Sequence, residues 1–302
     1  MERSTRYVRV RSTPKLRSPV LIAAFAGWND AAEVATHATQ FLVRRLGAER
    51  FADIDPEEFF VFSEQRPQVR IDEGSQRVIE WPVNEFYYRE AMHGERDCIL
   101  LIGTEPQMRW RTFVDAILTH AIDLGATLVV TLGGLLADVP HSRAPRLTGS
   151  STDPVLAERL GRMDVRTSRY EGPTGILGVL NQECKARGVP SGSLWGNVPH
   201  YIGGTPNPKV TSALLHRLDD LLGFELDLSE IDESVAAFEE QVRDAIGRDP
   251  EAQAYVRQLE NREDQGLAED SPASHSDADL PSGEEMVREL EEFLKRRDDE
   301  TK

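Results

Sequence analysis

Short apolar runs alternate along most of the chain with segments whose apolar residues recur every three or four positions. Runs such as 98–102 and 128–132 are apolar at almost every position, which is typical of parallel strands buried on both faces. In 208–222, by contrast, Leu214, Leu218 and Leu222 share one helical face. The predicted strands are 19–26, 58–62, 76–81, 97–102, 127–132 and 191–196. The predicted helices are 30–46, 107–124, 175–187, 208–222, 229–246, 250–263 and 284–297.

Because strands and helices alternate, we expect βαβ units and an α/β fold, a three-layer α/β/α sandwich with a C-terminal helical extension. The segment 57–90 departs from this pattern. It contains two or three strand candidates with no helix between them, which indicates a hairpin insertion or an antiparallel edge. The predicted parts are an N-terminal arm (1–18), a core domain (19–224), an acidic helical extension (225–263), a disordered linker (264–283) and a C-terminal amphipathic helix (284–302).

The net charge of −17 is concentrated in the C-terminal quarter of the chain. Residues 225–302 carry 25 acidic and 9 basic side chains, whereas residues 1–224 carry 27 and 26. This balance disfavours nucleic acid as a partner, because phosphate binding needs clustered Lys and Arg. The acidic region is either a solvated helical face with a solubilising linker or a docking arm for a basic partner.

Two cysteines, Cys98 and Cys184, predict a reducing compartment and no disulfide framework. Cys98 lies in an apolar run and is expected to be a buried packing residue. No segment approaches the roughly 18 consecutive apolar residues of a membrane span. The arginines at the N-terminus are not followed by the apolar stretch of a secretory signal. We therefore expect a cytoplasmic protein that does not bind membranes.

Five predicted strands or loops end in turns that carry polar or aromatic side chains. In parallel sheets ligands and partners meet the strands at their carboxyl ends, so these turns hold the candidate cleft or interface. The candidate residues, in chain order, are Trp28, Asn29, Asp30, Glu105, Arg109, Asp138, His141, Arg143, Tyr170, Thr174, Trp195, His200 and Tyr201.

Several of these residues also have a purely structural interpretation. Asp30 followed by Glu33 resembles a capping box at a helix N-terminus. Trp28 is either a lid over the core or an interface surface. Glu105 suits the start of a helix, and Arg109 either pairs with it at i, i+4 or binds an anion.

Glycine and proline mark three further turns. Gly133 and Gly134 indicate close backbone approach. The sequence Gly172-Pro173-Thr174-Gly175 opens a helix with free N–H groups that suit an anion. Asn207 followed by Pro208 predicts a helix N-cap.

The sequence contains none of the motifs that specify a common reaction or cofactor. It lacks a Walker A motif, Gly-x-Gly-x-x-Gly, Gly-x-Ser-x-Gly, His-Glu-x-x-His and Cys-x-x-Cys. We expect no cofactor. A metal site built from Glu105, Asp138, His141 and His200 is an alternative that no ligand spacing supports.

Taken together, the turns resemble the proteasome assembly chaperone family, in its second-subunit branch, as an actinobacterial-type member. The matching pieces are Gly27-Trp28-Asn29-Asp30-Ala31, Gly103-Thr104-Glu105-Pro106 with Arg109-Trp110, Gly133-Gly134 with 138–143, 170–176 with 178–180, 193–195 with 199–201, and 206–208. The resemblance covers roughly 15–260. It implies a fold like that of phosphorylases and hydrolases, and a non-catalytic chaperone that docks on proteasome α-subunits. Some relatives dock through a C-terminal hydrophobic-Tyr-x tail. This sequence ends Arg297-Asp-Asp-Glu-Thr-Lys302, so we do not expect that mode here.

Three functional hypotheses follow. The first is a non-enzymatic assembly-chaperone-like or interaction protein, a homo-oligomer (expected to be a trimer) with proteasome α-subunits as the expected partner. The alternative is a small-molecule-binding protein or hydrolase/phosphorylase-like enzyme that uses the strand-end cleft. It requires the candidate side chains to converge on a pocket. The third assigns the function to the acidic C-terminal region as an electrostatic arm.

Overall fold

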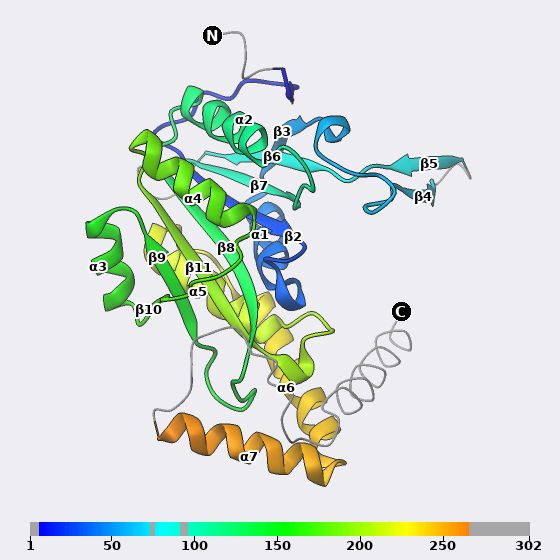
Figure 1. Ribbon diagram of the computed structural model, residues 1–302, viewed down its shortest axis with the longest axis vertical. Helices are drawn as coiled ribbons and strands as arrows, with labels where there is room; N and C mark the ends of the chain where they lie inside the picture. The colour runs from blue at the N-terminus through cyan, green and yellow to red at the C-terminus, as the bar shows by residue number, and fades with distance from the viewer. Residues whose placement is uncertain (1–5, 73–75, 91–95, 266–302) are drawn as a thin grey trace.

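The computed structural model describes residues 6–72, 76–90 and 96–265, and in this part of the chain nine strands form one mixed sheet (Figure 1). The central strands are parallel, and the outer strands are mostly antiparallel. In their order across the sheet, the strands are β1 (Val8–Val10), β3 (Glu49–Ile54), β6 (Asn84–Arg89), β7 (Cys98–Thr104), β2 (Val20–Ala26), β8 (Leu128–Ala137), β11 (Ser191–Pro199), β9 (Leu147–Ser151) and β10 (Arg166–Thr167).

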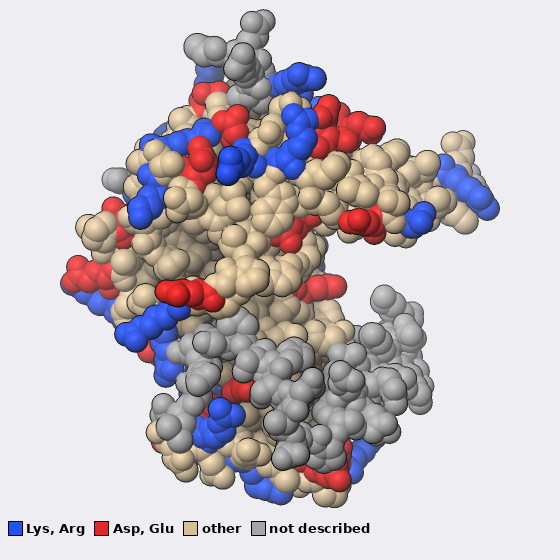
Figure 2. Space-filling view, viewed as in Figure 1, with Lys and Arg blue, Asp and Glu red and all other residues tan. Residues whose placement is uncertain are grey.

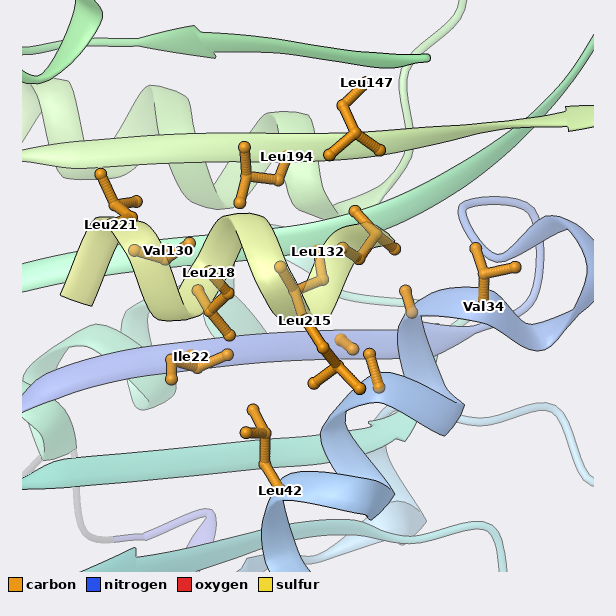
Figure 3. Close-up of a cluster of buried hydrophobic side chains, with 14 of the residues drawn as sticks. Ile22, Val34, Leu42, Val130, Leu132, Leu147, Leu194, Leu215, Leu218 and Leu221 are labelled. Carbon is orange, nitrogen blue, oxygen red and sulfur yellow. The ribbon is translucent and has the colours of Figure 1, made fainter. Parts of the chain in front are cut away.

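Helices cover both faces of this sheet, which confirms the predicted α/β/α fold. Helices α1 (Val34–Leu46) and α5 (Pro208–Leu222) pack on one face, and α2 (Trp110–Asp123) and α4 (Ile176–Arg187) on the other. Figure 3 shows Leu215, Leu218 and Leu221 of α5 over the apolar side chains of β2, β8 and β11. A short helix, α3 (Pro154–Arg162), packs near β9, β10 and β11.

The continuous apolar strands follow from this layering. Along β2, Leu21 and Phe25 face α2 and α4, whereas Ile22 and Ala24 face α1 and α5, and all four are fully buried. Such strands have no polar face, because both of their faces are covered. Cys98 is buried in the same way on β7, as expected.

The predicted strand at 58–62 is wrong. Pro56–Glu58 forms a short 3-10 helix, and Asp55 accepts a hydrogen bond from the Glu57 N–H at its start. Phe59 and Phe60 are nevertheless buried, so their hydrophobicity serves the core from an irregular segment. The strand in this part of the chain is β3, which directly follows α1.

The segment 57–90 does contain both structures that its pattern indicated. Strands β4 (Gln68–Ile71) and β5 (Arg77–Glu80) pair with each other in a separate two-stranded sheet, and β6 is an antiparallel neighbour of β3 and β7. Figure 1 shows β4 and β5 projecting from the side of the molecule. Helix α2 begins at Trp110 and not at 107, because Arg109 has a left-handed φ of 56°.

Two helices follow the sandwich. Helix α6 (Ser229–Gly247) packs on α5, and α7 (Pro250–Asp264) packs on α6 near the carboxyl ends of β8 and β11 (Figure 1). Both match the predicted helices closely. The predicted linker, from residue 266 onward, and the predicted helix at 284–297 lie outside the described residues. None of the helices that the structure describes is both long enough and apolar enough to cross a bilayer.

Candidate functional site

Asn29 and Glu105 join three strand ends to the start of α4. Glu105 Oε1 accepts hydrogen bonds from the Asn29 side-chain amide and from the Ile176 backbone N–H, both at 2.7 Å. The Gly134 N–H donates to the Asn29 carbonyl oxygen at 2.8 Å. These four residues, here called the Asn29–Glu105 network, therefore connect β2, β7 and β8 with α4.

Gly175 is required by the same network. A Cβ at this position would lie 2.3 Å from Asn29 Oδ1, so a larger residue would displace the amide. The N–H group that follows, on Ile176, is the one that Glu105 binds. The glycine-rich opening of α4 was predicted to suit an anion, and in this structure the anion is the carboxylate of Glu105.

Of the two interpretations of Arg109, the pairing with Glu105 is wrong, because Glu105 binds Asn29 and Ile176. The Arg109 guanidinium instead pairs with the Glu58 carboxylate, donates to Tyr7 Oη at 3.0 Å and lies over the Tyr7 ring. It anchors the N-terminal segment to the turn before α2.

Asp30 does bind the start of a helix, but not as the predicted capping box. Its carboxylate accepts from the Ala35 N–H at 2.7 Å and is also bonded to Thr36. Glu33 does not reach back, because it adopts a left-handed conformation and pairs with His37 at 3.1 Å. Burial raises the pKa of the Asp30 carboxyl, and the bonds to Thr36 and Ala35 oppose that rise.

The Gly133–Gly134 pair serves close approach, as expected, on both faces of β8. A Cβ on Gly133 would lie 2.5 Å from the Trp195 ring, and one on Gly134 would lie 2.5 Å from Val34. Trp195 is half-buried over this strand and packs with the cluster of α2 and α4. It is thus a packing residue in this fold.

Trp28, Tyr170 and Thr174 also lie at the surface. Trp28 is 60% exposed, which contradicts a lid over the core and leaves the interface interpretation as a prediction. Tyr170 is 43% exposed, and its hydroxyl donates to the Pro173 carbonyl oxygen at 3.1 Å. Thr174 is also exposed.

The remaining candidates lie together under α7. Tyr201 is buried, and its hydroxyl accepts the His141 N–H at 2.7 Å and lies 2.8 Å from His141 Nδ1. Burial, followed by the charge of nearby Lys209, lowers the pKa of His141 to about 4. His200 pairs with Asp138 at 3.2 Å, and its ring lies 5.7 Å from that of Tyr255 on α7.

Acidic side chains of α7 hold the loop that carries His141. Glu263 pairs with Arg146 at 2.8 Å, and Asp264 pairs with Arg143 at 3.0 Å. Glu260 accepts from Ser142 at 2.5 Å. Together with the His141–Tyr201 pair, these three interactions of α7 are called the α7 contact below.

The sequence reasoning missed Glu260 and Glu263 as partners of this loop. The sequence did contain a signal for this contact, because the extension is rich in acidic residues and the loop 138–146 contains Arg143 and Arg146. The docking-arm interpretation assigned the acidic residues to a basic partner protein, whereas α7 pairs with arginines in a loop of its own chain. Among the residues that the structure describes, no group of three or more His, Cys, Asp and Glu is arranged to hold a metal ion.

The comparisons with known proteins agree with this architecture. The family model described as the PAC2 family matches residues 24–246. A PAC2 family protein from Streptomyces avermitilis is 42% identical over 79% of this chain and 99% of its own, with a TM-score of 0.71. The Mycobacterium tuberculosis proteasome-assembly chaperone homologue Rv2125 is 37% identical over 78% of this chain and 99% of its own, also with a TM-score of 0.71.

A more distant structure is that of Pyrococcus furiosus PbaB, an archaeal proteasome activator. It is 26% identical over 78% of this chain and 97% of its own, with a TM-score of 0.64. No curated protein matches the sequence.

Proposed function

Because the chain belongs to the PAC2 family, we propose that it is a non-enzymatic, proteasome-linked protein of the assembly-chaperone type. The observation that carries this proposal is the 37% identity to the mycobacterial proteasome-assembly chaperone homologue, over 99% of that protein. The archaeal proteasome activator supports the same class of partner. We propose proteasome α-subunits as the partner and a homo-oligomer, expected to be a trimer, as the active form.

The use of the strand-end side chains supports an interaction protein over an enzyme. Asn29 and Glu105 bind each other and α4, and Asp30 binds α1. His141 and Tyr201 bind each other beneath α7. Side chains that are engaged in contacts within the fold favour an interaction protein over the small-molecule alternative, which requires side chains that converge on a pocket.

The exposed candidates then define the proposed docking surface. Trp28 and Tyr170 present large aromatic side chains to solvent, and aromatic residues are enriched in protein interfaces. Two buried, free cysteines, Cys98 and Cys184, suit a reducing compartment, so we propose that the protein acts in the cytoplasm.

The test is co-purification of proteasome α-subunits with the tagged full-length chain from an actinobacterial host that contains proteasomes. Trp28→Ala should reduce the recovered α-subunit several-fold while the melting temperature stays unchanged, because the indole is exposed. Val155→Ala is a matched control, since Val155 is a 74% exposed apolar residue on α3. Normal proteasome assembly in a deletion strain, together with no recovered α-subunit, would contradict the proteasome link.

A further inference from the structure

The two-stranded sheet of β4 and β5, here called the ribbon, has one apolar face and one polar face. In its antiparallel register Val69 lies opposite Ile79, and Ile71 lies opposite Arg77. Opposite residues share a face, so these four side chains lie together, and Trp81 follows by alternation. On the other face Arg70 pairs with Glu80 at 2.5 Å, beside Gln68 and Val78.

The apolar face is exposed to solvent. Val69 is 62% exposed, Ile71 65% and Ile79 54%, and the space-filling view shows the ribbon projecting from the body (Figure 2). A two-stranded ribbon is at best marginally stable in water without a surface to pack against. A contiguous exposed apolar face on a projecting element is typical of a protein contact site.

A groove of about 750 Å³ lies between the base of this ribbon and the body of the molecule. Ile79 and Trp81 form its apolar wall. Its other lining holds four carboxylates, from Asp55, Glu57, Glu80 and Glu85. Arg9 pairs with Asp55 at 3.6 Å, Arg50 with Glu85 at 2.5 Å and Arg70 with Glu80 at 2.5 Å, which leaves Glu57 as the carboxylate that can take a further cation. The groove therefore suits an occupant that is apolar and carries a cation.

The outer end of the ribbon has these two properties. It presents Ile71 and Arg77, which lie opposite each other on the apolar face, at the end of β4 and the start of β5. We propose that the ribbon of a second copy of this chain lies in the groove, with the apolar faces in contact and Arg77 near Glu57. Each copy carries both the ribbon and the groove, so copies complement one another without a further component.

This inference rests on the proposed homo-oligomer and names the surface through which the copies meet. The test is the mass of the full-length chain across a wide concentration range, by light scattering or sedimentation. Ile79→Asp places a charge on the apolar face and should weaken self-association about 10-fold or more, because an apolar contact is lost and a carboxylate is desolvated. Val78→Asp is the matched control, since Val78 is the neighbouring residue on the polar face, and it should change the association midpoint less than about 3-fold.

A charge exchange tests the proposed register. Arg77→Glu and Glu57→Arg should each weaken association, and the double variant should recover part of the loss. Circular dichroism and melting temperature should be unchanged in every variant, because the ribbon lies outside both helix-covered faces of the main sheet and Glu57 is exposed.

The outcomes separate this inference from the proposed function. If the wild type is oligomeric and the Ile79→Asp variant forms an assembly of the same mass, the ribbon contact is wrong but the homo-oligomer is not contradicted. Equal weakening by Ile79→Asp and Val78→Asp also overturns it. A monomeric wild type at all concentrations overturns the ribbon contact and the homo-oligomer together. Selective loss of association in Ile79→Asp supports the inference, even when no α-subunit co-purifies.

Discussion

The Asn29–Glu105 network and the α7 contact both lie at the carboxyl edge of the sheet, but they differ in how they are buried. In the network, one oxygen of the Glu105 carboxylate accepts hydrogen bonds from the buried Asn29 amide and from the Ile176 N–H. In the α7 contact, long charged side chains lie around the partly buried His141 and the buried Tyr201, and Arg143 and Asp264 are largely exposed. A buried polar group that loses its only hydrogen-bond partner lowers the stability of the fold, whereas an exposed group forms hydrogen bonds with water instead. We therefore expect the network to determine stability and the α7 contact to determine where α7 lies.

The largest expected effect is from Glu105→Ala. It leaves the Asn29 amide and the Ile176 N–H without their acceptor, and should lower the free energy of unfolding by about 3 kcal/mol. Urea titration measures this loss. Glu105→Gln keeps an acceptor oxygen and should cost less than half as much. Equal and small losses for Ala and Gln would show that the network contributes little.

The second prediction concerns pH and the partly buried His141. The pKa of His141 is lowered by burial to about 4 in the folded state, against about 6.5 in an unfolded chain. The unfolded state therefore binds more protons between these values. Stability that is present above pH 6.5 is lost as the pH falls towards about 4, by roughly 1–3 kcal/mol.

The measurement is urea unfolding of the wild type and of His141→Gln between pH 7 and pH 4. The variant removes the titrating group, so the difference between the two curves isolates it from His120, whose pKa burial also lowers. Parallel curves across this range would contradict the prediction.

The sequence was informative about these regions to different extents. Local signals were read correctly: Asn207 caps α5 through its bond to the Val210 N–H, and Gly133 admits Trp195 closely. The partners of Glu105 and Arg146 lie 71 and 117 residues away, so no local spacing specifies them. The i, i+4 interpretation of Glu105 and Arg109 failed for this reason. Arg109 has a left-handed conformation, so α2 begins only after it and Glu105 is not part of the same helix. The Glu105 carboxylate binds Asn29 and Ile176 instead.

The strands outside the parallel centre were the hardest to predict. β3 directly follows α1 and has no regular alternation of charged and apolar residues, so the neighbouring aromatic run at 59–62 was the stronger signal. Phe59 and Phe60 of this run are buried, and they follow a turn that begins at Asp55 and Pro56. A hydrophobic run thus predicts that its residues lie in the core, but it does not predict whether their backbone forms a strand, a helix or a turn.

A third, smaller effect is expected at the half-buried pair of Arg146 and Glu263. Their side chains are only 11% and 18% exposed, so Glu263→Gln should cost about 1 kcal/mol, the scale of a charge-assisted hydrogen bond. The loss should appear as faster hydrogen exchange in α7, with exchange in the central strands unchanged. Faster exchange throughout the sheet would show that α7 is part of the cooperative core, and would remove the distinction drawn between the two regions.

The smallest effect is predicted for the neighbouring pair of Arg143 and Asp264, whose side chains are 46% and 61% exposed. Arg143→Ala should cost less than about 0.5 kcal/mol, because water and salt replace most of the interaction. A double-mutant cycle on this pair, compared with a cycle on Arg146 and Glu263, holds the helix, the loop and the charge types constant and varies the burial. If burial decides, the coupling energy should be larger for the Arg146 pair and less sensitive to salt. Equal coupling energies would mean that α7 is held by the sum of its charges, and the acidic extension would then act as the electrostatic arm that its composition suggested.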